Sequence, residues 1–182
     1  MRPLGYMYKR VATDLQWLNA PRVDDVYALS GCVSKNFADY IAFWKHNGYW
    51  LFDSPSMIRA LAVEHAISLD GAKLFYYEAH DLEYDSNSGS WFPFAPDPAF
   101  ETNVEAPGAA TLEGFDITTF HAGTSPECSP LSCNGLAADV ATNEHCLIPT
   151  FEAAILALES GRFDNSEPGP CRVIAVYSVN DA

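Results

Sequence analysis

The sequence predicts an α+β fold in which a mostly antiparallel sheet of five or six strands packs with three helices. Two observations carry this prediction. With 182 residues, 48% of them hydrophobic, the chain can bury roughly 70% of its unfolded surface in one core. Strand-like apolar runs also alternate with segments that have helical spacing and capping residues. We therefore expect residues 1–182 to form a single globular domain, and the sequence shows no internal repeat.

Local patterns place three strand candidates and two helices in the first half of the chain. Asn36 can cap a helix that ends before Gly48, and Ser54 followed by Pro55 supplies the cap and the first proline of a second helix. Aromatic and apolar runs indicate the strands. We expect strands at residues 4–11, 26–29 and 49–52, and helices at residues 37–46 and 55–65.

The rest of the chain adds four strand candidates and a further helix. A turn-forming stretch at residues 85–90 links two of the strands. Thr150 can cap the helix, which Gly161 ends. The last run of the chain is apolar at consecutive positions, which is typical of a strand covered on both faces in the middle of a sheet. We expect strands at residues 74–84, 91–94, 115–121 and 171–179.

Charge is distributed unevenly along the chain. There are 24 acidic and 10 basic side chains, a formal net charge of −14, and no Lys or Arg lies between Leu74 and Gly161. So few cations argue against nucleic-acid binding and against anionic membranes. The acidic segment would instead attract a basic protein partner. The leading functional hypothesis is therefore an acidic protein-interaction module that binds a basic partner.

Several common functional classes lack their signatures in this sequence. No apolar run approaches the ~20 residues of a transmembrane helix, and the N-terminal residues lack the apolar centre of a signal peptide. We therefore expect a cytoplasmic protein with reduced cysteines. There is also no glycine loop that could cradle a phosphate and no common hydrolase motif, so we expect no cofactor.

The densest group of reactive side chains lies at residues 121–146. A cysteine attacks as the thiolate, so a neighbouring histidine or a helix N-terminus must lower its pKa. Asn134 can cap a short helix, which would place the preceding thiol near the positive end of the helix dipole. The alternative function is therefore a pocket-based enzyme or small-ligand binder, against the simpler interpretation that these cysteines fill space beneath loops. The candidate catalytic residues are Cys133, His145 and Cys128, with His121 as an alternative base.

A second stretch, residues 44–53, interleaves aromatic side chains with Lys, His, Asn and Asp. Small-molecule pockets combine apolar walls with a few convergent polar groups. The competing interpretation is a helix end followed by a core strand. The candidate ligand-binding residues are Trp44, His46, Asn47, Asp53, His121 and Asn134.

A structural zinc site within residues 121–146 is a third hypothesis. Cys128 and Cys133 have the spacing of a zinc-ligand pair. His145 and Cys146 are adjacent, so in an extended segment they would point to opposite faces and at most one could join the site. No residue is assigned as a metal ligand on this basis.

Four strings in the sequence resemble those of a group of short bacterial proteins. They are residues 44–55 (WKHNGYWLFDSP), 125–134 (SPECSPLSCN), 143–147 (NEHCL) and 167–170 (EPGP). The likeness spans the whole chain, and the group has no assigned activity. The resemblance therefore implies a stand-alone single domain and adds no fold, substrate or catalytic residue.

Overall fold

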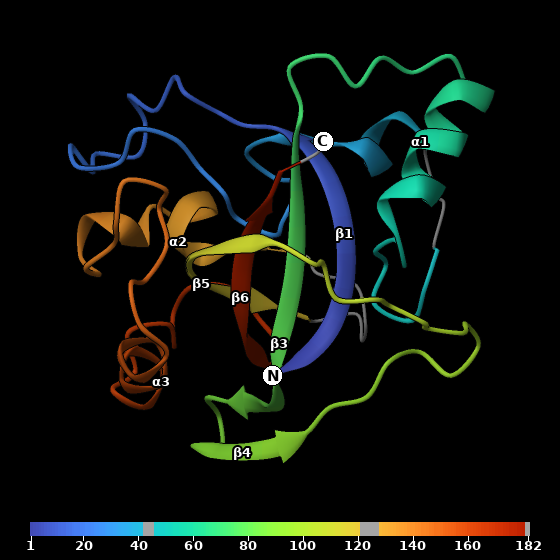
Figure 1. Ribbon diagram of the computed structural model, residues 1–182. Helices are drawn as coiled ribbons and strands as arrows, with labels where there is room; N and C mark the ends of the chain where they lie inside the picture. The colour runs from blue at the N-terminus through green and yellow to red at the C-terminus, as the bar shows by residue number, and fades with distance from the viewer. Residues whose placement is uncertain (42–45, 121–127, 181–182) are drawn as a thin grey trace.

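One antiparallel sheet runs through the molecule (Figure 1). The computed structural model describes residues 1–41, 46–120 and 128–180. In this part of the chain the strand order is β2-β1-β3-β6-β5, and β4 pairs with β3. The strands are β1 (Arg2–Arg10), β2 (Lys35–Asn36), β3 (Lys73–Asp85), β4 (Ser90–Pro93), β5 (Ala110–Thr119) and β6 (Cys171–Val179). The α-helices are α1 (Pro55–Glu64), α2 (Pro130–Cys133) and α3 (Phe151–Glu159), and the 3-10 helices are η1 (Phe37–Tyr40) and η2 (Leu136–Ala138). The predicted α+β class is confirmed.

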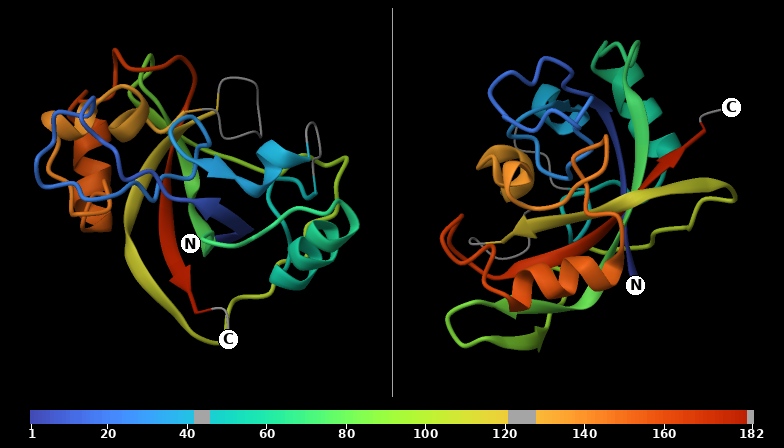
Figure 2. Two further views of the ribbon diagram at one scale, coloured as in Figure 1. Left: turned by 90° about the horizontal axis from the view of Figure 1, so that it is seen from above. Right: turned by 90° about the vertical axis from the view of Figure 1, so that its left-hand side faces the viewer.

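Strand β6 occupies the position that its sequence predicts. It lies between β3 and β5, and its side chains alternate between two hydrophobic cores. Ile174 and Val176 belong to the core around β1 and α1, whereas Val173 and Ala175 belong to the core around β5 and α3. The helices α1 and α3 lie at opposite ends of the molecule with the sheet between them (Figures 1 and 2). The continuous apolar run is therefore the consequence of burial on both faces.

Two of the short strand candidates lie outside the strands, and each forms a single isolated bridge. Val26 bridges Ala12, and Phe52 bridges Tyr6. The helix predicted from residue 37 is a single 3-10 turn with a capping box, and residues 42–45 lie outside the described part of the chain. These local apolar runs are therefore buried without belonging to a strand ladder.

The structure contains an internal repeat that the sequence does not reveal. The first unit runs β1, η1, an Asn47-centred turn, α1 and β3, and the second runs β5, α2, an Asn143-centred turn, α3 and β6. In both turns the asparagine Oδ1 accepts from the backbone N–H groups two and four residues later. The residue three positions after each asparagine, Trp50 or Cys146, has a positive φ of 63° or 61°. The two units thus share local geometry although the sequence shows no repeat.

Each unit also has a glycine in its first strand that leaves room for the turn to pack against the sheet. Gly5 in β1 and Gly114 in β5 have φ values of 136° and 149°, and each lies at a register shift in its strand. The residue after each glycine forms the isolated bridge to the turn, Tyr6 to Phe52 and Phe115 to Ile148. A side chain at either glycine would collide with the turn.

A local two-fold axis relates the two units. Gly5 pairs with Tyr77 in β3, and Gly114 pairs with Val176 in β6, so Tyr77 and Val176 occupy equivalent positions. These two residues pair directly with each other across β3 and β6. The units differ in the length of chain that follows their first strand: residues 11–34 separate β1 from β2, whereas Cys128 already bridges Thr119 at the end of β5.

Replacing Gly114 with alanine should destabilise the fold. The added Cβ would lie 2.9 Å from Leu147 Cβ and 3.0 Å from Ile148 O, on a backbone conformation that L-residues avoid. We expect the free energy of unfolding to fall by about 2 kcal/mol or more in urea titrations. The control is Gly108→Ala, where no atom lies within 4 Å of the added Cβ, and where we expect a change of less than about 1 kcal/mol. Equal effects of the two substitutions would contradict this role for Gly114.

Candidate functional site

Three thiols converge on the face of the sheet covered by the long loop of the first unit. The Sγ atoms of Cys32, Cys128 and Cys133 all lie within 4.8 Å of one another. They come from three different segments. Cys32 lies in the loop at residues 11–34, Cys128 bridges Thr119 at the end of β5, and Cys133 is the last residue of α2. The inserted loop of the first unit therefore completes a site whose other two members belong to the second unit.

Lys9 fixes the loop that carries Cys32. Its side chain is buried, and Nζ donates to the carbonyl oxygens of Leu29 at 3.2 Å and Ser30 at 2.9 Å, and also to that of Ala28. An ammonium group has three donors, so all three have an acceptor here. Burial lowers the pKa of Lys9 to about 8, while nearby acidic groups, Asp116 foremost, oppose this. Lys9 is thus a buried cation at neutral pH.

Asp116 joins the same loop to α2. Its Oδ2 accepts from Leu29 N at 2.8 Å, Ser129 Oγ at 2.6 Å and Thr118 Oγ1 at 3.2 Å. Ser129 Oγ in turn accepts from Ser30 N at 3.2 Å. Burial raises the pKa of Asp116 to about 6, against the hydrogen bonds and the Lys9 charge that favour the carboxylate. This buried network holds the Cys32 loop against the segment that contains Cys128 and Cys133.

The three thiols differ in their acid strength. The pKa of Cys133 is lowered to about 5, first because Cys128 donates a hydrogen bond to its sulfur, and further because of hydrogen bonds from the Ser129 backbone, Cys32 and Ser132. Hydrogen bonding to Cys133 and burial raise the pKa of Cys128, and burial chiefly raises that of Cys32. The hydrogen bonds within the group therefore favour the thiolate form of Cys133 over that of Cys128 or Cys32.

Asn134 is the polar neighbour of this site. Its Oδ1 lies 3.4 Å from Cys128 Sγ, and its Nδ2 donates to Glu167 Oε1 at 3.0 Å. The single Cys128 proton thus has two acceptors within reach, and the charged Cys133 sulfur is the stronger one. Asn134 is the C-cap of α2, and the following 3-10 helix begins after Gly135. The predicted helix N-terminus at Cys133 is therefore wrong, and the low pKa comes from hydrogen bonds.

The other two cysteines are core residues. Cys146 and Cys171 are buried, and burial raises the pKa of each thiol to about 12. Such thiols are unreactive at neutral pH. Sequence reasoning associated Cys146 with the reactive group and did not assign Cys32 to it. The local sequence around Cys32 carries no signal for this contact, because the contact depends on the buried Lys9 and Asp116.

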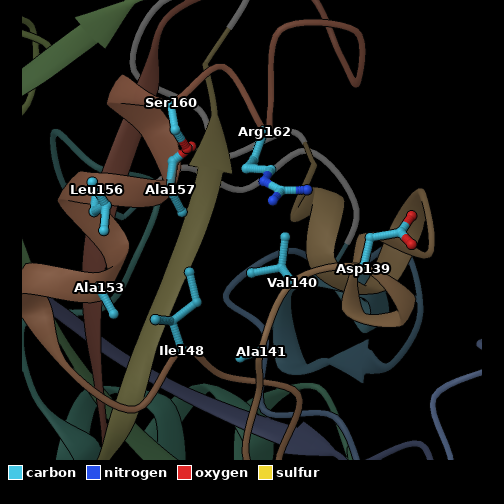
Figure 3. A pocket seen from close by; sticks show the side chains of 9 residues that line it. All are labelled: Asp139, Val140, Ala141, Ile148, Ala153, Leu156, Ala157, Ser160 and Arg162. Carbon is cyan, nitrogen blue, oxygen red and sulfur yellow. The ribbon is translucent and has the colours of Figure 1, made fainter.

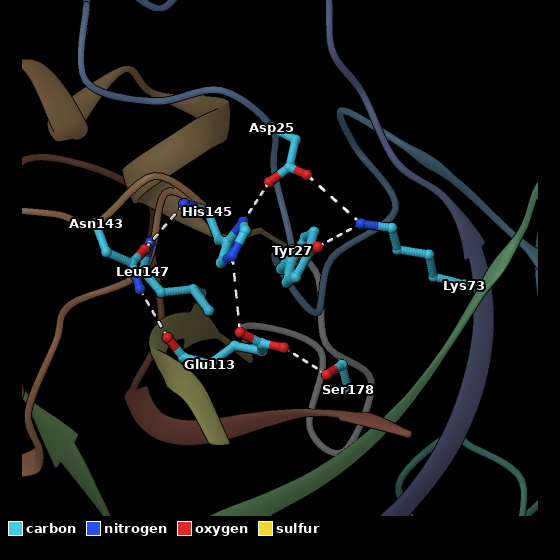
Figure 4. Close-up of polar contacts among 8 residues, drawn as sticks. All are labelled: Asp25, Tyr27, Lys73, Glu113, Asn143, His145, Leu147 and Ser178. Carbon is cyan, nitrogen blue, oxygen red and sulfur yellow. Dashed lines mark hydrogen bonds and ion pairs between the residues drawn. The ribbon is translucent and has the colours of Figure 1, made fainter. Parts of the chain in front are cut away.

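The predicted base His145 belongs to a separate polar network (Figure 4). Its Nδ1 lies 2.6 Å from Asp25 Oδ1, its Nε2 lies 3.7 Å from Glu113 Oε2, and its ring stacks on Tyr27 with centroids 4.0 Å apart. Lys73 pairs with Asp25 at 3.7 Å. The other predicted base, His121, lies outside the described residues. Of the predicted catalytic residues, the structure brings together Cys128 and Cys133.

Three of the six residues predicted to bind a ligand, His46, Asn47 and Asp53, lie in the turn before α1. Asn47 is buried and donates to Leu4 O at 3.0 Å and to Asp53 Oδ1 at 2.9 Å, and Asp53 Oδ2 accepts from Asn103 N at 3.1 Å. His46 stacks on Phe52, and burial lowers its pKa to about 4. Trp44 lies outside the described residues. These contacts give His46, Asn47 and Asp53 a structural role in the turn. Asn134, in contrast, lies beside the thiols.

A separate groove of about 760 Å³ lies between α3 and the segment after η2 (Figure 3). Val140, Ile148 and Leu156 contribute apolar surface, and Asp139 and Arg162 lie at its rim. None of the predicted site residues lines this groove.

Comparisons with protein-family models, with curated proteins and with solved structures find no match to this chain. The resemblance to short bacterial proteins therefore stays a prediction. Within the described residues, no helix is long and apolar enough to cross a membrane. The functional conclusion must come from the arrangement of side chains.

Replacing Lys9 with methionine should be strongly destabilising. Three carbonyl groups lose their donor, and the buried Asp116 loses its counter-charge. We expect the free energy of unfolding to fall by about 3–5 kcal/mol in urea titrations. The matched control is Lys73→Met in the paired position of β3, where the ammonium side chain is 52% exposed and the expected loss is below about 1 kcal/mol. A Lys9 variant as stable as the Lys73 variant would show that the buried cation does not hold the loop.

Proposed function

We propose that this protein is a thiol-dependent redox protein in which Cys133 is the nucleophile and Cys128 the resolving thiol. The observation that carries the proposal is that the Sγ atoms of Cys32, Cys128 and Cys133 lie within 4.8 Å of one another, where contacts of the other two cysteines lower the pKa of the half-buried Cys133. A thiolate at neutral pH, with a second thiol in contact, is the arrangement that thiol–disulfide exchange requires.

The reaction has two displacement steps. The Cys133 thiolate attacks one sulfur of a disulfide substrate, so that a mixed disulfide forms and the other half leaves as a thiolate. Cys128 then gives its proton to the released thiolate or to water and attacks the Cys133 sulfur, which forms an internal disulfide and releases the second half as a thiolate. The substrate gains two electrons and the protein loses two. An external dithiol reverses both steps.

The electrostatics favour this order of events. In the resting site the Cys133 sulfur is the main cause that raises the pKa of Cys128. A mixed disulfide at Cys133 removes that negative charge, so Cys128 deprotonates more readily at the moment when it must attack. Lys9 supplies a positive charge that interacts with Cys133 and Cys32.

The rate of alkylation by iodoacetamide should report the low pKa of Cys133. Because the thiolate is the reactive form, we expect the rate at Cys133 to be half-maximal near pH 5 and nearly constant between pH 6 and pH 8. Cys128→Ala removes the principal donor and should move the midpoint upward towards the ordinary cysteine value of about 8.5. Peptide mass spectrometry identifies the site, and Cys171 provides an internal unreactive thiol. A wild-type midpoint near 8.5 would refute the proposal.

A second candidate function, binding of a basic protein partner, is favoured by one further observation. The backbone N–H groups of Asp24 and Asp25 donate to Glu144 O at 2.8 and 3.2 Å, which brings two acidic stretches together. Glu113 lies beside them through His145. Other carboxylates of the acidic segment are engaged within the molecule, as Glu83 is with Arg172 at 2.7 Å. The exposed carboxylates at residues 24 and 144 are therefore the place where we expect a cationic partner to bind.

Two double variants of equal net charge test this second candidate. Asp24→Asn with Glu144→Gln removes two exposed charges from the joined stretches, whereas Glu101→Gln with Glu152→Gln removes two exposed charges elsewhere. The probe is a fluorescent lysine- and arginine-rich peptide at low salt. We expect the first pair to weaken binding about threefold more than the second, and high salt to abolish the difference. Identical affinities of the two double variants for the peptide would show that it binds through the overall charge of the protein and not through the joined acidic stretches.

A further inference from the structure

We propose that Cys32, Cys128 and Cys133 form a binding site for a thiophilic metal ion, in the first place Zn²⁺, with a fourth coordination position open to solvent or ligand. The inference uses the same three sulfurs as the proposed function but does not depend on the exchange reaction. It differs from the zinc hypothesis drawn from sequence, because its third ligand comes from the loop of the first unit.

The spacing of the sulfur atoms suits an ion of this class. At a Zn–S distance of about 2.3 Å, the sulfurs of a tetrahedral site lie about 3.8 Å apart. The three Sγ atoms already lie within 4.8 Å of one another, so closure on an ion requires shifts of about one ångström or less. Within residues 1–41, 46–120 and 128–180, no other group of three His, Cys, Asp or Glu side chains meets this spacing. Thiolates also select soft ions over Mg²⁺ or Ca²⁺.

The surroundings of the sulfurs hold them in place without an ion. Lys9 fixes the carbonyl groups of residues 28–30, and Asp116 with Ser129 joins that loop to α2. Ligands held in advance by a hydrogen-bonded outer shell lose little conformational entropy when an ion binds. Cys32 is exposed, so an ion can reach the site from solvent at this side.

The charge of the loaded site would be nearly balanced. Three thiolates around a dication carry a net charge of −1, and the Lys9 cation that interacts with Cys133 and Cys32 lies beneath them. Cysteine binds such an ion as the thiolate, so binding should release protons.

The experiment is a titration of the reduced full-length protein with Cd²⁺, whose thiolate charge-transfer absorbance reports sulfur ligation, followed by displacement with Zn²⁺. We expect saturation at one ion per chain, release of protons measured with a pH indicator, and loss of affinity of about 100-fold or more in each of Cys32→Ser, Cys128→Ser and Cys133→Ser. The control is Cys171→Ala, which removes a thiol outside the group and should bind as the wild type does.

Two further measurements keep the outcomes distinct. Circular dichroism checks that each variant is folded, and Zn²⁺ should protect Cys133 of the wild-type protein from iodoacetamide, which requires no variant. Absence of the charge-transfer band at one equivalent, or unchanged affinity in Cys32→Ser, would overturn the metal site. Rapid alkylation near pH 6 without ion binding would leave the redox proposal standing alone. Ion binding with an alkylation midpoint near 8.5 would support the metal site and reject the redox proposal.

Discussion

The buried ammonium group of Lys9 is the constraint on which the candidate site depends. The 24-residue loop that follows β1 is not part of a strand ladder. The Lys9 ammonium group binds the carbonyl oxygens of three consecutive residues of this loop, residues 28–30. Burying a charge costs free energy unless hydrogen bonds and an opposite charge compensate. Here the carbonyl oxygens and Asp116 provide that compensation, and the loop acquires a defined path across the sheet as a result. The position of Cys32 follows from that path.

The same polar network separates the roles of the five cysteines. Thiols embedded in apolar surroundings, such as Cys171, are harder to ionise and behave as small hydrophobic side chains. Cys133 has the opposite behaviour because its sulfur lies among hydrogen-bond donors and near a cation. The chemistry of a cysteine in this fold is therefore decided by its neighbours from other segments. Its position along the sequence contributes little.

Local sequence patterns were sufficient to predict the long helices and the central strand of the fold. The caps at Ser54 and Thr150 and the doubly buried run of β6 predicted α1, α3 and the central strand, because each signal lies within the segment that it specifies. The turns at Asn47 and Asn143 could not be predicted in this way. Their short apolar runs look like strands, and only the hydrogen bonds of a buried asparagine side chain show that the backbone bends there.

The candidate site was predictable in part for the same reason. Cys128 and Cys133 lie close together in sequence and were recognised as a pair. Their proposed partner His145 is held by Asp25 and Glu113, and their actual neighbour Cys32 is about 100 residues away. Contacts of this kind depend on loop paths and buried charges, which hydrophobic periodicity does not encode.

The pairing of Tyr77 with Val176 on the local symmetry axis has a consequence for how such a molecule diversifies. Two copies of a half-length chain, joined through the same central strands, would form the symmetric dimer that this arrangement mimics. In a dimer of identical halves every change occurs twice. In a fused chain one half can lengthen a connection while the other keeps its short one, and an asymmetric centre can then arise on a symmetric scaffold.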